Sequence, residues 1–85
     1  MMIPYIERFM RWRKENVPEG EVLDREFGDG GMLVAEVRKA DKRYVGTVYS
    51  YSIKQKRFKE VKGSKRLFRR PIDALTWLKE EYRRF

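Results

Sequence analysis

Turn-forming residues divide the middle of this 85-residue chain into short segments. The stretches GDGG at 28–31, ADKR at 40–43 and KQK at 54–56 supply the Gly, Asp and polar residues that tight turns require. GDGG also offers residues that tolerate the positive φ of a hairpin turn. Short turns join neighbouring strands antiparallel, so the sequence predicts a four-stranded antiparallel β-meander. Its strands are expected at 21–27, 32–39, 44–53 and 57–62.

The alternation of side chains within two of these strands bears on what covers the sheet. In 32–39, Leu33, Ala35 and Val37 lie on one face and the charged residues Glu36 and Arg38 on the other. In 44–53 neither face is plainly polar, because tyrosines or valines occur on both. We expect each terminal helix to cover one face of the sheet. The alternative is that one face stays open and exposes aromatic rings beside basic side chains.

Amphipathic helix patterns occur at both ends of the chain. Tyr5, Phe9 and Trp12 recur at helical spacing after Pro4, which predicts a helix over about 4–16.

The second pattern begins at Pro71, which suits the first turn of a helix. Its apolar stripe has the width expected of a core-facing surface, and Trp77 lies at its flank. The stripe consists of Ala74, Leu75, Leu78, Tyr82 and Phe85. Across both helices, the residues expected to be buried against the sheet are Phe9, Trp12, Leu75, Leu78 and Tyr82. The segment 63–70 is expected to be a loop. The predicted fold is therefore a single α+β domain, residues 1–85, with the element order α-β-β-β-β-α.

The composition excludes several classes of chemistry. The chain has no cysteine and no histidine, which removes disulfides, thiol chemistry, the usual zinc sites and the usual general base. GDGG lacks the lysine and hydroxyl residue of a P-loop, and no other catalytic motif occurs. We therefore expect no enzymatic activity, no cofactor and no metal. No apolar run approaches the roughly 20 residues of a membrane span, so we expect a cytoplasmic protein without a membrane partner. We expect it to be a monomer or a homodimer.

The positive charge of the chain is concentrated in residues 54–70. The chain has 21 basic and 13 acidic residues, a net charge of +8, and this segment holds nine of the basic residues but a single acid, Glu60. The rest of the chain is balanced, with 12 basic and 12 acidic residues. A clustered basic surface is typical of proteins that contact nucleic-acid phosphates. The predicted function is non-enzymatic binding of DNA or RNA, with phosphate contacts from Lys54, Lys56, Arg57, Lys59, Lys62, Lys65, Arg66, Arg69 and Arg70.

Aromatic residues have two expected roles around this segment. If one sheet face is open, Tyr44, Tyr49 and Tyr51 are the candidates to stack on bases. Phe58 and Phe68 interrupt the basic residues and are expected to anchor the segment to the core.

Other interpretations of the basic segment remain open. The chain has one asparagine and one glutamine, and charged residues make up 40% of it. This pattern is reported for hyperthermophile proteins, whose surfaces carry ion-pair networks. The acids of the first predicted strand, Glu21, Asp24 and Glu26, could supply the partners. The segment could instead meet an anionic membrane surface or an acidic protein. The alternative function is a protein-interaction module or inhibitor, encoded by a virus or plasmid, that docks on a nucleic-acid-processing protein.

Two stretches resemble known nucleic-acid-binding families. YVGTVYSYSIKQKRFKEVKGSKRLFRRPIDALTWLKEEY, residues 44–82, resembles the three-stranded-sheet-plus-helix DNA-binding arm of tyrosine recombinases. In that arm a helix follows the last strand, as RPIDALTWLKEEY does here, and the resemblance implies a sheet that enters the major groove. KGSKRLFRR, residues 62–70, is similar to the basic cluster that begins the last helix of double-stranded-RNA-binding domains. Here Pro71 falls where that family keeps a continuous helix, and four strands are one too many.

Overall fold

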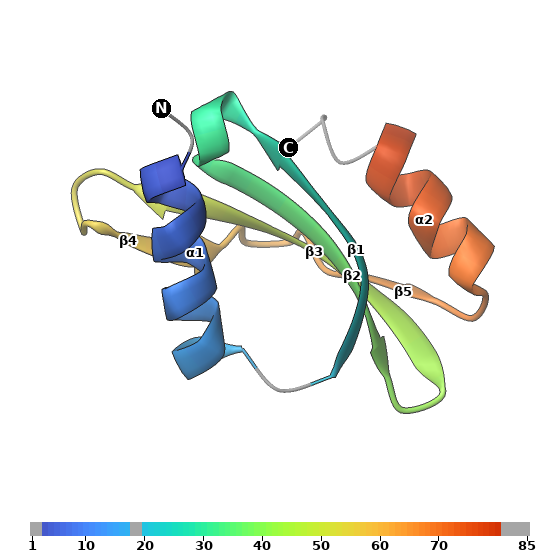
Figure 1. The fold of residues 1–85 in the computed structure, drawn as a ribbon. Coiled ribbons are helices and arrows are strands. Elements are labelled where there is room, and N and C mark those ends of the chain that lie inside the picture. Colours follow the sequence, from blue (N-terminus) through green and yellow to red (C-terminus); the bar gives the residue numbers. More distant parts are fainter. Residues whose placement is uncertain (1–2, 18–19, 81–85) are drawn as a thin grey trace.

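The computed structural model describes residues 3–17 and 20–80 and confirms the predicted α+β fold class. Two helices flank a meander of four strands, to which a short fifth strand is added (Figure 1). In chain order the elements are α1 (Ile3–Asn16), β1 (Glu21–Gly28), the 3-10 helix η1 (Asp29–Gly31), β2 (Leu33–Ala40), β3 (Arg43–Ser52), β4 (Arg57–Glu60), β5 (Arg66–Phe68) and α2 (Pro71–Glu80). The last part of the predicted C-terminal helix, with Tyr82 and Phe85, lies outside the described residues. Neither α1 nor α2 is both long and apolar enough to cross a membrane.

The turns adopt the backbone conformations that their residues favour. The predicted positive φ is found in the GDGG turn, at Asp29 (51°), Gly30 (65°) and Gly31 (96°), where the chain forms η1. Asp41 in the β2–β3 turn and Lys56 in the β3–β4 turn also have positive φ, at 60° and 56°. Each of these turns reverses the chain between antiparallel neighbours.

Two short strands, β4 and β5, pair with different parts of the same edge of β3. The sheet order is β1-β2-β3-β4, and β5 also pairs with β3. Residues 49–52 of β3 pair with β4, whereas residues 44–46 pair with β5. The prediction that 63–70 is only a loop is therefore wrong, because it contains β5. A strand of three residues is too short to show the alternation by which strands are recognised in a sequence.

Ser64 occupies the gap between β4 and β5. Its hydroxyl accepts a hydrogen bond from the Val48 N–H (3.1 Å) and donates one to the Val48 carbonyl (3.3 Å). Val61 N–H donates to the same carbonyl at 2.8 Å. Ser64 is fully buried, and its hydroxyl is the acceptor for the Val48 N–H at the point where neither β4 nor β5 pairs with β3.

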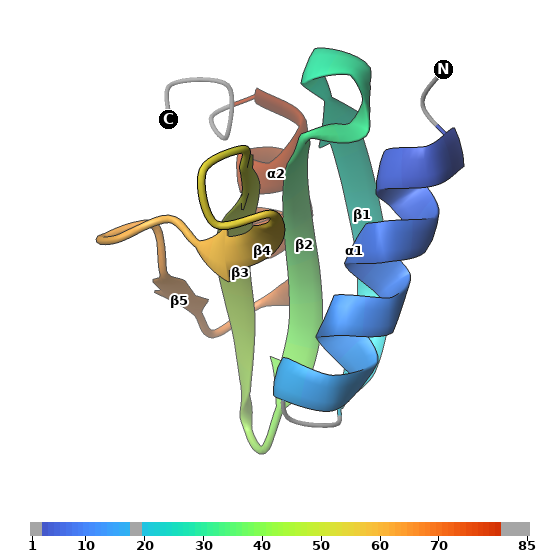
Figure 2. The ribbon, with the colours of Figure 1, turned by 90° about the vertical axis from the view of Figure 1, so that its left-hand side faces the viewer.

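The two helices cover opposite faces of the sheet, as the sequence favoured (Figures 1 and 2). Side chains of β2 and β3 alternate between two separate apolar clusters. The α2-side cluster is made of Ala35, Val37, Val48, Ala74, Trp77 and Leu78. The α1-side cluster is made of Phe9, Val34, Tyr49 and Phe58. Because helices lie over both faces, the alternative of an open aromatic face is wrong.

The helical residues expected in the core are buried to different extents. Phe9 and Leu78 are fully buried, whereas Trp12 and Leu75 are half-buried. Trp77, predicted at the flank of its stripe, is only 3% exposed. Its indole lies over Gly46 of β3, where an added Cβ would be 2.5 Å from Trp77 Cζ3. Gly46 therefore makes room for the ring, which the helical wheel alone could not show.

Glu36 is buried on the α1 side, although the alternation placed it on a polar face. It is 1% exposed and is surrounded by the guanidinium groups of Arg13 from α1 and Arg25 from β1. Arg13 Nε donates to Glu36 Oε2 at 2.6 Å, and Arg25 Nη2 donates to the same oxygen at 2.7 Å. The hydrogen bond with Glu36 raises the pKa of Arg13. These bonds hold α1 at a defined position on the sheet.

Candidate nucleic-acid interface

All nine basic residues of 54–70 are exposed and follow one edge of the sheet. We call this set the basic edge. It runs from the β3–β4 turn along β4, through the gap, along β5 and up to the start of α2. The acids proposed as neutralising partners, Glu21, Asp24 and Glu26, lie on β1. Because β1 is the opposite edge of the sheet, those acids do not neutralise the basic edge.

Ion pairing within the basic edge is limited. Arg70 Nε donates to Asp73 Oδ2 at 3.0 Å, and this hydrogen bond lowers the pKa of the exposed Asp73 carboxyl. Arg66 donates to the carbonyls of Gly63 (2.9 Å) and Lys65 (3.1 Å). Within 3–17 and 20–80, no ion pair is formed by Lys54, Lys56, Arg57, Lys59, Lys62, Lys65 or Arg69. These seven residues thus lack, among the described residues, the acidic partners that a surface ion-pair network requires.

Two phenylalanines fix the basic edge to the core, as predicted. Phe58 of β4 is almost fully buried in the α1-side cluster, with its ring centroid 5.3 Å from that of Phe9. Phe68 of β5 packs on the α2-side cluster, 6.0 Å from Trp77. The two short strands within the basic edge are therefore held to the core from opposite sides of the sheet.

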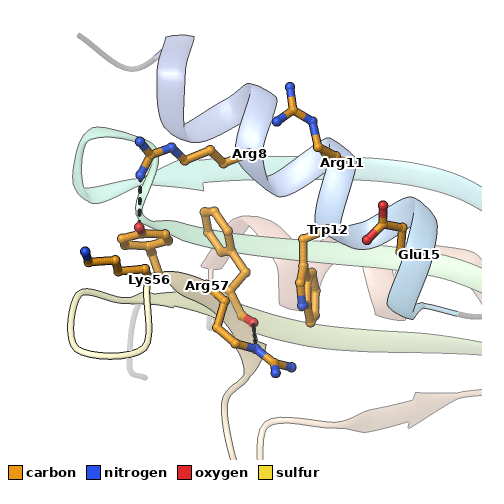
Figure 3. A pocket seen from close by; sticks show the side chains of 8 residues that line it. Arg8, Arg11, Trp12, Glu15, Lys56 and Arg57 are labelled. Atoms are coloured by element: carbon orange, nitrogen blue, oxygen red, sulfur yellow. Dashed lines mark hydrogen bonds between the residues drawn. The ribbon is translucent and has the colours of Figure 1, made fainter.

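A groove runs between α1 and β4, beside the basic edge. It consists of two hollows of about 420 and 310 Å³ that share Trp12 and Arg57. The first is lined by Arg8, Arg11, Trp12, Glu15, Tyr51, Lys56, Arg57 and Phe58. The second is lined by Trp12, Asn16, Val17, Arg38, Tyr49, Arg57, Lys59, Glu60 and Lys65. In the first hollow, Arg8 and Arg11 project from the helix while Lys56 and Arg57 come from the strand side (Figure 3). We call the two hollows together the α1–β4 groove; basic side chains outnumber acidic ones on its walls.

Three of these basic residues were missed by the sequence analysis. Arg8 and Arg11 belong to α1, which has four basic and two acidic residues, and this small excess does not stand out in a part of the chain that is balanced as a whole. Their helical spacing with Trp12 is the signal that could have placed them on one side of α1. Arg38 shares the α1 side of β2 with Glu36, but only the packing of α1 shows that this side borders a groove.

The predicted stacking tyrosines do not form an exposed platform. Tyr49 is 3% exposed, because Phe9 and Trp12 of α1 cover it, and this burial raises its pKa to about 12. Tyr44 is half-buried and packs on the α2-side cluster, away from the groove. Tyr51 lines the groove, but its hydroxyl accepts a hydrogen bond from Arg8 Nη1 at 2.9 Å (Figure 3). Tyr49 is therefore excluded as a stacking residue.

Two donors in the groove lack acceptors. The indole N–H of Trp12 and the Nε–H of Arg38 are buried and have no hydrogen-bond partner within the described part of the chain. Both side chains line the second hollow, where basic side chains again predominate. An unmade hydrogen bond at a buried donor costs about 1–3 kcal/mol. The groove is therefore short of acceptor groups.

No family model, curated protein or solved structure matches this chain. The resemblance to the recombinase arm implied a sheet that enters a DNA groove, yet helices lie over both faces here. In KGSKRLFRR, the part that is similar to double-stranded-RNA-binding domains, the chain forms β5 before α2 begins at Pro71. The site must therefore be interpreted from its own geometry.

Proposed function

We propose that this protein binds nucleic acid, DNA or RNA, through the basic edge and does so without catalysing a reaction. The observation that carries the proposal is the exposure of nine basic residues along one sheet edge, with a single acid in the same segment. A regular array of phosphates is the partner for such an array of cations, because each contact releases a condensed counterion.

The fold supports this proposal by limiting how much the basic edge can rearrange. Lys54 and Lys56 lie on a tight turn, and Arg57 and Lys59 on a strand anchored by Phe58. A preorganised array loses less conformational entropy on binding than a flexible basic tail of the same charge.

The test is a binding titration at several salt concentrations against duplex DNA, single-stranded DNA and structured RNA. For five or six phosphate contacts on duplex DNA, log K should fall with log salt with a slope of about −5. Replacing Lys59 and Lys65 together with glutamine should flatten the slope by up to about 2 and weaken all sequences alike.

The matched control replaces Lys14 and Lys79 with glutamine. Both are exposed lysines on helices, and neither lines the α1–β4 groove. The control removes the same charge from the molecule and should leave the slope nearly unchanged. Equal losses from both pairs, or a slope near zero, would remove the basic edge as the binding surface.

The protein-interaction alternative is an outcome of the same experiment. The large apolar side chains that are exposed, Met10, Ile53, Leu67 and Ile72, come from four different segments. Salt-insensitive capture of a protein partner, with no nucleic acid bound at moderate salt, would favour the interaction module.

A further inference from the structure

The α1–β4 groove combines basic walls with two half-buried aromatic side chains, Trp12 and Tyr51, at the border of the α1-side cluster. Trp12 is half-buried and separates the two hollows, as it lines both. Its aromatic neighbours Phe9, Tyr49 and Phe58 meet it at interplanar angles of 37°, 67° and 40°, so none stacks parallel to it. Figure 3 shows its indole extending from α1 toward the strands, beside Arg57.

The second half-buried ring of the groove, Tyr51, already has a cation beside it. Arg8 donates to the Tyr51 hydroxyl, and its guanidinium carbon lies 5.7 Å from the centroid of that ring. Tyr5 and Phe58 meet the Tyr51 ring edge-on, at 5.1 and 5.2 Å between centroids. Of these two half-buried groove rings, Trp12 is therefore the one over which no cation lies within the described residues.

The polar groups of the groove require acceptors and negative charge. Arg11, Arg57 and Lys65 border it without forming an ion pair to any described carboxylate. The Trp12 indole N–H and Arg38 Nε–H lack acceptors within the described residues. A ligand that joins a planar ring to phosphates supplies the negative charge that Arg11, Arg57 and Lys65 lack.

We infer that the α1–β4 groove binds single-stranded nucleic acid, with an unpaired base against Trp12 and the adjoining phosphates on Arg11, Arg57 and Lys65. This inference rests on the proposed nucleic-acid-binding function and specifies the form of the ligand. In a duplex the bases are stacked inside the helix and offer no free face, whereas a single strand presents every base for stacking. The hollows of about 420 and 310 Å³ also match the size of small-ligand sites, which suits single nucleotide units.

The experiment compares oligothymidylate, oligouridylate and a duplex of the same length at one salt concentration, with indole fluorescence and affinity as readouts. Both single strands should quench the fluorescence, and their affinity should exceed that of the duplex by about tenfold or more. Trp12→Phe should abolish the quenching, because the remaining Trp77 is buried on the other face, and should weaken single-strand binding about fivefold or more with little change for duplex.

A charge-matched pair keeps the test decisive if Trp12→Phe does not fold. Arg11→Gln removes a groove charge, whereas Lys14→Gln removes an exposed charge of the same helix outside the groove. Arg11→Gln should weaken single-strand binding several-fold more than Lys14→Gln. Duplex binding as tight as single-strand binding, without quenching and with equal losses from these two variants, would overturn the inference but leave the proposed function standing. Absence of binding to all three nucleic acids would overturn the proposed function itself.

Discussion

Ser64 shows how one side chain lets a strand have two different partners in succession. At Val48, the chain of β4 leaves β3 and β5 has not yet begun. Without the Ser64 hydroxyl, the Val48 N–H would be a buried donor with no acceptor. In the sequence, the serine is part of a basic, loop-like stretch and gives no sign of this structural role.

Ser64→Ala should lower the free energy of unfolding by about 1–3 kcal/mol, the cost of a buried unsatisfied donor. Urea unfolding would measure the loss, and amide hydrogen exchange should show faster exchange at Val48. Ser50→Ala is the control, because Ser50 is a half-buried β3 residue whose hydroxyl makes no hydrogen bond within the described residues; it should change stability by less than about 0.5 kcal/mol. Similar losses from both variants would show that the hydroxyl of Ser64 is not what matters.

Tyr49 should make the fold sensitive to alkali. Its pKa is about 12 in the folded protein, mainly because of burial, against about 10 in an unfolded chain. Below pH ~10 the phenol is protonated in both states and has no effect. Between pH ~10 and ~12 the unfolded chain releases this proton and the folded chain keeps it, so the free energy of unfolding should fall with pH, by about 2 kcal/mol in all.

Urea unfolding from pH 8 to 12 would test this for the wild type, Tyr49→Phe and Tyr44→Phe. Tyr49→Phe should remove about 2 kcal/mol of the alkaline loss, whereas Tyr44→Phe should leave it in place. If the free energy of unfolding falls equally at alkaline pH in the wild type and in Tyr49→Phe, Tyr49 is not the group responsible.

At the scale of elements, the close contact of Trp77 with Gly46 is one part of the packing that fixes α2 on the sheet. A Cβ at position 46 would lie 2.5 Å from Trp77 Cζ3 and 2.7 Å from Cε3. Gly46→Ala should therefore displace the indole and lower the free energy of unfolding by about 1–3 kcal/mol, as overpacking does.

The matched control for this substitution is Gly28→Ala on β1. The nearest atom to its added Cβ is Leu33 Cδ2 at 3.8 Å, an ordinary contact, so the change should be neutral or slightly stabilising. In chemical denaturation, Gly46→Ala combined with Trp77→Leu should cost less than the sum of the two single changes, because the smaller side chain removes the clash. Strictly additive losses would mean that the ring and the glycine do not interact as described.

The elements were predicted from the sequence where periodicity extended over many residues. Both helices and the four meander strands have clear patterns, and all were found close to the expected positions. In contrast, β5 exists because residues 44–46 of β3 have an unpaired edge, which is a tertiary cause that no local pattern contains. Glu36 likewise follows the alternation of its strand, but its burial depends on Arg13 and Arg25 arriving from two other elements.

The candidate site was predicted in part for the same reason. The basic edge is continuous in sequence, so composition alone located it. The α1–β4 groove joins residues far apart in the chain, and Trp12, which lines both of its hollows, was not among the predicted stacking residues. Which ring remains accessible depends on how α1 lies over the sheet, and no local sequence pattern specifies that placement.

At the scale of the whole molecule, the sheet lies between two thin apolar cores and does not cover a single thick one. Each helix encloses its own apolar cluster, and the two clusters are separated by the strands. A chain of this size buries only about 60% of the surface that its unfolded form exposes. Loss of either helix would uncover a complete face of the sheet, so both helices are needed for the fold.

The order of the strands also gives the molecule an electrical polarity. β1, with Glu21, Asp24 and Glu26, and the basic edge border the sheet on opposite sides, so these acidic and basic side chains are separated across the strands. The electric field of a polyanion orients such a molecule before contact. This orientation raises the fraction of encounters that lead to binding. If the basic edge binds nucleic acid as proposed, the acids of β1 lie on the side of the sheet away from the bound strand and repel a second polyanion. The proposed function therefore predicts a protein that coats one nucleic-acid chain without cross-linking it to another.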